Sequence, residues 1–511
     1  MSLARVHSMG LKGVEGYSVL VELDLANGLP SFSTVGMPDD GVREARERVV
    51  AAIRNSGFAV PNRRVTVNLA PARPRKQGSH YDLPIALSLL LASSQVAEGG
   101  GERRWCAVGE LSLDGRVRPV PGVLAMAARA KAEGFTSIIV PEANAEEARA
   151  AGIEALPAAD LREAADLAAG APPRPRPAAA AVAERVELLD LADVRGQFAA
   201  KRALEIAAAG GHNLLFVGSP GTGKSMLARR LPGLLPRLEG DEAVEVTMVQ
   251  SACGRVVPGL VTERPFRAPH HSCSAASLVG GGPSARPGEA CLAHGGVLFL
   301  DELAEFTRPA LEALRQPLED RSVRVARAQD SVEYPTRFML VAAANPCPCG
   351  WRGHPRKACV CGPIAMGRYM NRLSGPLIDR IDLQIETPAV AFSEWAAPVS
   401  GGESSARVRE RVSAARARQS ARWGGGVAAA NAFIDAAAFR RGVRALPEAM
   451  DVLAEAERKT SLSTRALDRV LRVARTIADL AQEGDVAASH VVEAAQQRGL
   501  DRLRSGLEVR A

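Results

Sequence analysis

The stretch LLFVGSPGTGKS, residues 214–225, joins a short apolar run to a glycine-rich loop. The apolar run predicts a buried strand, and the residues after the loop predict a helix. The loop has the pattern G-x-x-x-x-G-K-S, whose glycines let successive backbone N–H groups surround phosphates at the start of a helix. The order strand, loop, helix therefore predicts an α/β nucleotide-binding domain. The predicted phosphate-binding residues are Gly218, Ser219, Pro220, Gly221, Thr222, Gly223, Lys224 and Ser225.

A second motif supplies the acids that nucleotide hydrolysis requires. The stretch GVLFLDE, residues 296–302, predicts another buried strand, which ends in two carboxylates. Asp301 is expected to hold Mg²⁺ together with the Ser225 hydroxyl, and Glu302 to polarise the attacking water. Lys224 is expected to reach the outer phosphates. The alternative interpretation of the two acids is an acidic N-cap for a following helix.

Composition limits the class of protein. A chain of 511 residues is too long for one core and indicates about three domains. The net charge of +7 allows nucleic acid as a partner, although an ordinary solvated surface has a similar charge. The start of the chain lacks the apolar core of a signal peptide, and no apolar run approaches the length of a membrane span. We therefore expect a cytoplasmic protein without a membrane segment.

The domain organisation follows from one proline-rich segment. APPRPRPAAAAVAER, residues 171–185, predicts an extended, solvated linker. Residues 1–170 mix strand and helix patterns and predict an α/β domain. Residues 186–395 carry the nucleotide motifs, and residues 396–511 predict a helical lid rich in arginine. The predicted fold is thus α/β and multidomain, with a helical C-terminal part.

These motifs carry a family resemblance over nearly the full length of the chain. GSPGTGKS, VLFLDE and an asparagine at the end of a later strand resemble an AAA+ ATPase. LAHGGVLFLDEL, YPTRFMLVAAANP and SGPLIDRIDL resemble the magnesium-chelatase-like branch of that superfamily. With RPFRAPHH, residues 264–271, the chain resembles the ComM/YifB family, known as branch-migration helicases of natural transformation. The resemblance implies ATP and Mg²⁺ as cofactors, single-stranded or branched DNA as substrate, and a hexameric ring.

The resemblance also implies roles for single residues. Asn345 matches sensor 1, which orients the water, and Arg465 matches sensor 2 in the lid. Arg380 in LIDRID matches the arginine finger, which reaches the γ-phosphate held by the neighbouring subunit. Val194 and Gln197 match the positions that close over adenine. For a single arginine in this Arg-rich chain, a solvated face is the alternative.

Two segments are candidates for contact with DNA. RSVRVARAQDSVE, residues 321–333, alternates in strand period around a turn and predicts a hairpin, on which Arg324 and Arg327 are able to meet phosphates. Residues 270–282 interrupt the helix between the two nucleotide motifs, as pore loops of this branch do. The adjacent His270 and His271 are expected to have a structural or loop role, because neighbouring side chains rarely converge on one metal ion.

The N-terminal domain resembles the proteolytic domain of Lon, which implies a ribosomal-S5-like α/β fold. The resemblance is carried by GELSLDGRVRP, residues 109–119, and by the helix and strand that follow. The catalytic serine of Lon falls on His80, and its dyad lysine falls on Leu124. Ser79 is one position away, and a serine hydroxyl without a base beside it is a weak nucleophile. We expect no peptidase activity.

Four cysteines gather in CPCGWRGHPRKACVC, residues 347–361, between the sensor asparagine and the arginine finger. Two C-x-C pairs separated by a glycine-containing segment are able to fold back as a hairpin and present four thiolates to one tetrahedral Zn²⁺. Free thiols or redox-active pairs are the alternatives. We expect this insert to lie near the nucleotide and the subunit interface. The predicted zinc ligands are Cys347, Cys349, Cys359 and Cys361.

Together these features predict an ATP-driven hexameric motor that acts on DNA in recombination or natural transformation. The alternative is a magnesium-chelatase-like motor that remodels a protein partner or assists metal insertion. An inert nucleotide-binding scaffold is disfavoured because Glu302, Asn345 and Arg380 are all present.

Overall fold

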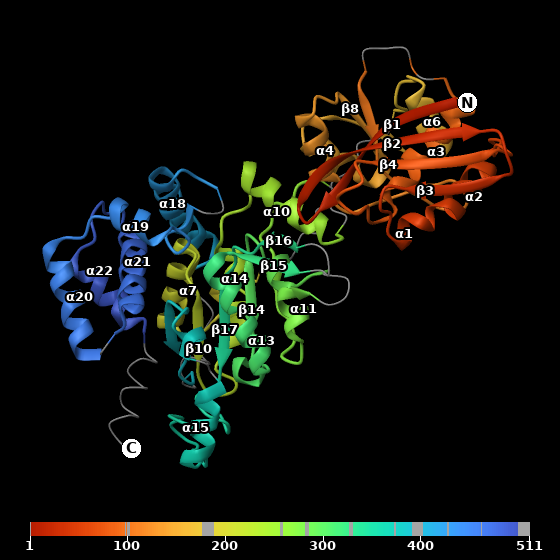
Figure 1. Cartoon of the computed structure of the whole chain (residues 1–511). Helices are drawn as coiled ribbons and strands as arrows, with labels where there is room; N and C mark the ends of the chain where they lie inside the picture. The colour runs from red at the N-terminus through yellow and green to blue at the C-terminus, as the bar shows by residue number, and fades with distance from the viewer. Residues whose placement is uncertain are drawn as a thin grey trace. The chain divides into compact units, whose positions relative to one another are not determined.

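The chain folds into two compact units, shown in the computed structural model of Figure 1. Unit 1 contains residues 1–185 and 243–261, and unit 2 contains residues 186–242 and 262–511. The prediction of an α/β multidomain fold is confirmed, and the C-terminal helices share unit 2 with the nucleotide-binding sheet. The structure describes residues 2–97, 99, 103–175, 189–255, 259–281, 286–326, 331–372, 375–390, 402–426, 429–460 and 462–498.

Unit 1 is built on a four-stranded sheet in the order β1-β2-β4-β3. β1 and β2 form a long antiparallel hairpin, and β3 runs parallel to β4. Alternate residues of β2 are buried, as expected for a sheet with one face on the core, and the helix α3 packs on β1 and β2. The elements are β1 (Ser2–Lys12), β2 (Glu15–Ala26), β3 (Ser31–Val35), β4 (Arg64–Ala70) and α3 (Asp82–Ala92).

A second, parallel sheet of unit 1 has the order β5-β8-β9 and is accompanied by the short pair β6 and β7. Its strands are β5 (Trp105–Ala107), β6 (Glu110–Leu111), β7 (Val117–Arg118), β8 (Ser137–Pro141) and β9 (Glu154–Ala158). The remaining helices are α1 (Asp40–Arg43), α2 (Ala45–Asn55), α4 (Val123–Ala132), α5 (Ala145–Ala150) and α6 (Leu161–Ala168). Glu44 ends α1 and immediately precedes α2.

Most of helix α10 (Gly240–Ala252) belongs to unit 1, although the chain enters it from unit 2. Its Ser251 hydroxyl contacts the buried carboxylate of Glu147 and accepts a hydrogen bond of 2.7 Å from the Gly122 backbone N–H. The same carboxylate accepts a bond of 2.9 Å from the Leu124 N–H. Buried polar groups need such partners, so this network holds residues 243–261 in unit 1.

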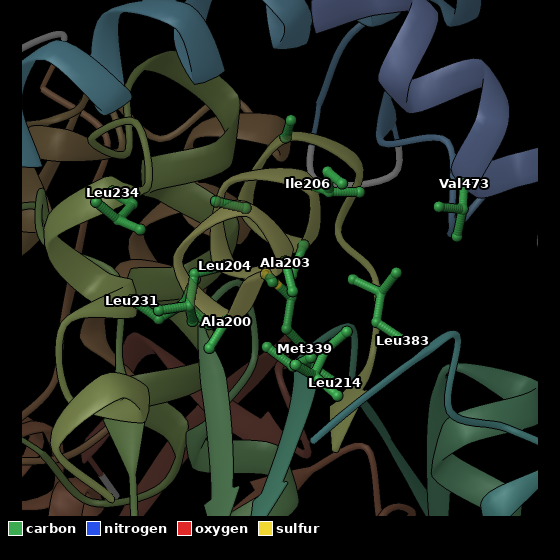
Figure 2. Packing of buried hydrophobic residues seen from close by; sticks show 14 of the residues in the cluster. Ala200, Ala203, Leu204, Ile206, Leu214, Leu231, Leu234, Met339, Leu383 and Val473 are labelled. Atoms are coloured by element: carbon green, nitrogen blue, oxygen red, sulfur yellow. The ribbon is translucent and has the colours of Figure 1, made fainter. Parts of the chain in front are cut away.

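Unit 2 is built on a five-stranded sheet in the order β11-β14-β17-β10-β18, and all neighbouring strands are parallel. The carboxyl ends of all five strands therefore lie at one edge of the sheet, where ligands of open α/β folds bind. Figure 2 shows side chains of α7 packed among residues of β10, β17 and β18. The strands are β11 (Phe266–Arg267), β14 (Val297–Leu300), β17 (Met339–Ala344), β10 (Leu214–Val217) and β18 (Leu383–Glu386).

The helices of unit 2 cover this sheet and form the C-terminal helical part, which is blue in Figure 1. Around the sheet lie α7 (Phe198–Gly210), α8 (Lys224–Ala228), α9 (Leu231–Leu234), α11 (Ala275–Val279), α12 (Glu289–Leu292), α13 (Arg308–Ala313), α14 (Arg315–Asp320), α15 (Pro363–Arg372) and α16 (Gly375–Ile378). The C-terminal helices are α18 (Ser405–Trp423), α19 (Ala436–Gly442), α20 (Pro447–Thr460), α21 (Thr464–Leu480) and α22 (Ala488–Gln496). Among the described residues, no helix has both the length and the apolar composition needed to cross a membrane.

Many arginines of the C-terminal helices form ion pairs within the unit. Arg422 and Arg475 both bind Asp479, and Arg475 and Asp479 are almost completely buried. Arg472 pairs with Asp468 at 2.9 Å. These arginines stabilise the packing of the helices, so the basic composition of this region is partly balanced by acids of the same chain.

Candidate nucleotide site and cysteine cluster

The phosphate-binding loop lies between β10 and α8, at the carboxyl edge of the central sheet. The Gly218 N–H donates a bond of 3.2 Å to the Ala344 carbonyl oxygen, which ties the loop to β17. Gly223 has φ = +86°, a conformation that an L side chain rarely adopts, and the space where its Cβ would lie is open. The loop thus leaves an open face at the start of α8, which fits bound phosphates.

The Lys224 ammonium joins the loop to the predicted sensor residue. Its Nζ donates to the carbonyl oxygens of Gly218 at 2.6 Å and Ser219 at 2.9 Å, and to Oδ1 of Asn345 at 3.2 Å. Burial lowers the pKa of Lys224, although Asp301 opposes this effect. The structure therefore brings Lys224 and Asn345 into direct contact across the ends of two strands.

The Ser225 hydroxyl donates a hydrogen bond of 2.6 Å to Oδ2 of Asp301, which follows β14. Two adjacent hard oxygen ligands suit Mg²⁺, so the pair fits the predicted metal site. Glu302 has φ = +52°, which is uncommon outside glycine, and its side chain is 57% exposed. It precedes a short 3₁₀ helix without making a side-chain cap bond, so the N-cap interpretation of the two acids is not supported.

A cleft of about 340 Å³ opens beside these residues, lined by His271, Glu302, Ala304, Glu305, Asn345 and Tyr369. The Tyr369 hydroxyl, on α15, donates a hydrogen bond of 2.9 Å to the Asn345 carbonyl oxygen. His271 Nδ1 lies 3.4 Å from Oε2 of Glu302. No sequence pattern pointed to Tyr369, and the position of His271 beside Glu302 follows only from the pairing of β11 with β14.

The two residues predicted to close over adenine differ in their surroundings. Val194 is buried in the core of unit 2. Gln197 precedes α7, and its Nε2 donates to the carbonyl oxygens of Thr222 at 3.2 Å and Pro388 at 2.7 Å. Gln197 therefore contacts the phosphate-binding loop directly. Val194 precedes Gln197 closely in the sequence.

The two arginines predicted to act in catalysis meet on one carboxylate. Arg380 forms an ion pair with Glu319 of α14, and only 6% of the Arg380 side chain is exposed. Arg465, which is 73% exposed, lies 3.8 Å from the same Glu319 oxygen. Hydrogen bonding by Arg380 and the charge of both arginines hold the pKa of Glu319 below its ordinary value. The structure thus places Arg380 and Arg465 together, and gives both an anionic partner within the chain.

The predicted hairpin before the sensor strand is confirmed. β15 (Ser322–Ala326) pairs antiparallel with β16 (Ser331–Pro335), and Arg324 stands opposite Glu333. Their side chains form an exposed ion pair of 3.1 Å. The charge of Arg324 is therefore partly balanced, and Arg327 lies outside the described residues.

The four clustered cysteines come together as the spacing predicts. Their sulfur atoms all lie within 4.8 Å of one another. Cys349 Sγ is 3.4 Å from Cys347 Sγ and 3.7 Å from Cys359 Sγ. Zinc–sulfur bonds of about 2.3 Å in a tetrahedron place the sulfurs roughly 3.8 Å apart, so these thiols fit one Zn²⁺.

Backbone N–H groups surround the sulfurs, as is expected for thiolates. Cys349 N–H donates to Cys361 Sγ at 3.3 Å. Hydrogen bonds from the N–H groups of Trp351 and Val360 lower the pKa of Cys349 to about 6. Burial raises the pKa of Cys347. At Cys361 the Cys349 N–H lowers the pKa, but burial and the neighbouring thiols outweigh it and raise the pKa to about 12. One thiol of the cluster is therefore the readiest to ionise without a metal. His354 Nδ1 instead accepts backbone bonds within the loop, which agrees with four sulfur ligands and no histidine.

The cysteine loop packs on the nucleotide site. Gly350 has φ = +80°, and a Cβ at this position would lie 2.7 Å from Cδ of Pro220 in the phosphate-binding loop and 3.9 Å from Cγ of Asn345. Only glycine permits so close an approach of the two loops. The insert therefore packs against the predicted phosphate-binding loop, and its place near a subunit interface stays a prediction.

In unit 1, the positions that the Lon resemblance assigns to the catalytic dyad hold other groups. His80 is buried, and burial lowers its pKa to about 4. Leu124 is fully buried in α4, and the Ser79 hydroxyl contacts the carboxylate of Glu110. A serine–lysine dyad is not formed by these residues.

Comparison with known proteins agrees with this geometry. Family models match residues 190–395 as magnesium chelatase, subunit ChlI, residues 21–144 as subunit ChlI of Mg-chelatase, and residues 402–498 as the C-terminal part of ChlI. The chain is 43% identical over 505 residues to the uncharacterized protein YifB of Escherichia coli, covering 98% of both chains. It is 42% identical over 512 residues to the competence protein ComM of Haemophilus influenzae, covering 98% of this chain and 99% of ComM. A magnesium-chelatase 67 kDa subunit of Heliobacterium mobile is 30% identical over 203 residues, covering 33% of this chain. The chain therefore belongs to the ComM/YifB family of magnesium-chelatase-like AAA+ proteins.

Proposed function

We propose that this protein is an ATP-driven motor that assembles as a hexameric ring and moves on DNA, as a helicase or branch-migration factor. The observation that carries the ATPase proposal is the convergence of Lys224, Asn345, Ser225 and Asp301 at one edge of the sheet. ATP supplies the phosphoryl group, and Mg²⁺ neutralises its charge. An inert nucleotide-binding scaffold needs no catalytic acid. This site has an exposed Glu302 carboxylate that lines a cleft with room for water.

Each residue has a distinct task in the proposed reaction. Lys224 exchanges its loop carbonyl partners for phosphate oxygens, and Ser225 with Asp301 holds Mg²⁺. Glu302 accepts a proton from the attacking water, which Asn345 orients. Gln197 is proposed to lie near the adenine.

The ring proposal rests on the two arginines. Arg380 and Arg465 are proposed to stabilise charge on the phosphates, with Arg380 reaching the nucleotide of a neighbouring copy. Their meeting on Glu319 supports a common anionic target, because a carboxylate and a phosphate attract the same guanidinium groups.

The DNA proposal draws on a relative's name and on the hairpin. The relative from Haemophilus influenzae is named competence protein ComM, and Arg324 on the hairpin β15–β16 is 71% exposed. A cytoplasmic motor on single-stranded or branched DNA is consistent with both. The magnesium-chelatase family models support the second candidate, a motor that remodels a protein partner or assists metal insertion.

ATP turnover measured with no DNA and with single-stranded, duplex and branched DNA tests the proposal. We expect hydrolysis that rises with at least one DNA and that shows cooperative dependence on subunit concentration, as a ring requires. Hydrolysis that none of these DNAs changes would reject the DNA motor and favour the second candidate. No hydrolysis under any condition would reject the ATPase.

We further propose that the cysteine cluster holds one structural Zn²⁺. Its donor set, the sulfur spacing and the N–H bonds to sulfur support this. The metal would fix the shape of a loop that has little core of its own, and so would fix Gly350 against Pro220 beside the nucleotide.

A further inference from the structure

The cysteine loop and the helix that follows it carry formal charge of one sign. Residues 347–372 contain five arginines and lysines and no aspartate or glutamate, in a chain whose whole net charge is +7. This short segment therefore accounts for most of the basic excess of the protein. A Zn²⁺ bound by four thiolates would add two negative charges and still leave the segment positive. The cations are Arg352, Arg356, Lys357, Arg368 and Arg372.

Most of these cations lack an acidic partner. In the part of the chain that the structure describes, Arg356, Lys357 and Arg368 are exposed and form no ion pair. Arg372 is 60% exposed and lies 3.8 Å from the carboxylate of Glu305. Arginines of the C-terminal helices instead bind acids of the same unit at shorter distances. Unpaired cations held close together repel one another, so this surface favours an anionic partner.

The loop also holds an aromatic ring beside the cations. The backbone N–H groups of Arg356 and Lys357 both donate to His354 Nδ1, at 3.1 and 3.0 Å, which fixes the turn that carries them. The Trp351 ring meets the His354 ring edge to face, with centroids 5.2 Å apart and planes at 86°. The Lys357 ammonium lies 3.9 Å from the centroid of the Trp351 ring. Cations with an aromatic ring suit a single nucleic-acid strand, which offers phosphates to the first and unpaired bases to the second.

The same segment touches the proposed nucleotide site. Gly350, which directly precedes Trp351, lies against Pro220 of the phosphate-binding loop. On α15, which projects beyond the strands of the central sheet in Figure 1, the Tyr369 hydroxyl donates to the Asn345 carbonyl oxygen at 2.9 Å. A ligand on this surface is therefore one residue along the chain from a contact with the phosphate-binding loop.

We propose that the cysteine loop and α15 form a binding surface for single-stranded nucleic acid, and that a strand bound there stimulates ATP hydrolysis through these contacts. The inference rests on the proposed motor function and adds a second nucleic-acid surface to the hairpin β15–β16. The cations neutralise backbone phosphates, and the Trp351 indole stacks on a base in place of Lys357. An acidic protein would satisfy the cations alone, whereas the indole beside them favours a strand whose bases are free to stack.

Variants of the full-length chain test charge and stacking separately. Arg356→Ala combined with Arg368→Ala removes two exposed cations that have no ion pair, and the same positions changed to lysine keep the charge. Trp351→Ala removes the indole. The control, matched in charge, is Arg440→Ala with Arg441→Ala, which removes two exposed cations of α19. Fluorescence anisotropy of labelled single-stranded and duplex DNA gives Kd at several salt concentrations, and ATP turnover with added strand gives the stimulation.

We expect the double alanine variant to bind the single strand about tenfold more weakly, with the slope of log K against log salt reduced by about 1. The double lysine variant and the α19 control should bind as the parent does. Trp351→Ala should weaken single-strand binding by at least about fivefold and leave the salt slope and the duplex affinity unchanged. Stimulation of ATP turnover at a fixed strand concentration should fall in parallel with binding.

Parent-level affinity and salt slope in the double alanine variant would overturn the inference. It would also be overturned if the double lysine variant bound as weakly as the double alanine variant, because the charge would then not be the cause. Loss of rings by the double alanine variant in sedimentation, at concentrations where the parent assembles, would assign the surface to a contact between copies and reject the inference. Equal loss of single-strand and duplex binding in Trp351→Ala would reject the single strand as ligand. A parent chain that binds no DNA would instead reject the proposed DNA motor, and the inference with it.

Discussion

Arg380 forms an ion pair with Glu319 of its own chain, and almost none of the Arg380 side chain is exposed. An arginine that acts on a neighbour's nucleotide must leave such a partner, so Glu319 and the phosphate compete for it. The Arg380 carbonyl oxygen stays bound meanwhile, because it accepts a bond of 2.9 Å from the Asn213 side chain and one of 3.0 Å from Arg469. The side chain is therefore able to change partner while the backbone stays fixed.

Mixed rings test whether Arg380 acts between subunits. Arg380→Ala is expected to lower kcat by about 10³-fold or more, as for other arginine fingers. Mixing this variant with the inactive Lys224→Ala chain should recover hydrolysis, because the second chain supplies an intact Arg380 to the nucleotide of the first. Arg315→Ala is the control. Arg315 lies at the start of α14, the helix that carries Glu319, and forms an ion pair of 2.7 Å with Glu312, so the variant removes that pair and should stay active. Mixtures that never regain activity would assign Arg380 a purely structural role.

Replacing the proposed phosphate-binding lysine should affect ATP binding, whereas replacing the proposed catalytic acid should affect only hydrolysis. Lys224→Ala removes the phosphate contact and is expected to abolish detectable ATP binding. Glu302→Gln is expected to keep affinity near that of the parent and to lower kcat by at least about 10²-fold, because only the base is lost. Binding of a fluorescent ATP analogue and steady-state hydrolysis measure the two effects. Parent-level hydrolysis by Glu302→Gln would show that another group activates the water.

The hairpin should contribute phosphate contacts to DNA binding. Arg324→Ala combined with Arg327→Ala is expected to weaken binding and to reduce the slope of log K against log salt by about 1 to 2, because fewer counterions are released. Basal ATP turnover should not change. Glu333→Gln is a control with the opposite expected effect. It removes the carboxylate paired with Arg324 and should strengthen DNA binding. A salt slope that neither change alters would place the DNA surface elsewhere.

Because the four cysteines fit one Zn²⁺, we expect metal analysis of the purified protein to find about one zinc per chain. Cys347→Ser with Cys349→Ser should release the metal and lower ATP turnover, since Gly350 would no longer be held against Pro220. Cys106→Ala, in the core of unit 1, is the control and should retain zinc. Metal-free parent protein, or a zinc-free variant with normal rings and normal turnover, would contradict this account.

The buried carboxylate of Asp382 predicts a pH dependence of stability. Burial alone would raise its pKa, but Arg469 and His212 together hold the pKa well below the ordinary value of 3.8. A lowered folded pKa stabilises the fold above the unfolded pKa, and this contribution is lost as pH falls below about 4. Asp382→Asn should therefore destabilise the chain by about 3 kcal/mol near pH 7, because Arg469, whose side chain is only 24% exposed, loses its counter-ion.

Thermal and urea unfolding of the parent and Asp382→Asn at several pH values measures this difference. It should shrink progressively as the pH falls below about 4, because Asp382 of the unfolded parent takes up a proton there while the folded carboxylate stays charged. Asp435→Asn, at an exposed helix cap, should show a much smaller difference at every pH. A difference that stays constant down to pH 3 would exclude the charge of Asp382 as its cause.

The sequence predicted those parts of the site that depend on local pattern. The contact of Ser225 with Asp301 follows from two motifs that each end a buried strand, and the cysteine cluster follows from spacing alone. Strand alternation likewise predicted the hairpin β15–β16. In each case short-range sequence determines where the side chains point.

Other features depend on tertiary packing and were missed. Glu319 covers Arg380 only because α14 lies against the segment before β18, which no local pattern specifies. The long strand β1 also escaped prediction, because its burial comes from pairing with β2 and packing under α3. The His271–Glu302 contact required knowledge of which strand lies beside β14.

The assignment of residues 243–261 to unit 1 means that the backbone passes between the units three times, at residues 185–186, 242–243 and 261–262. Cutting the chain before residue 186 would therefore not release an intact motor unit. It would remove unit 1 from around Val246, Val249 and Ser251 of α10, which are buried in the intact chain, and so expose apolar side chains to water.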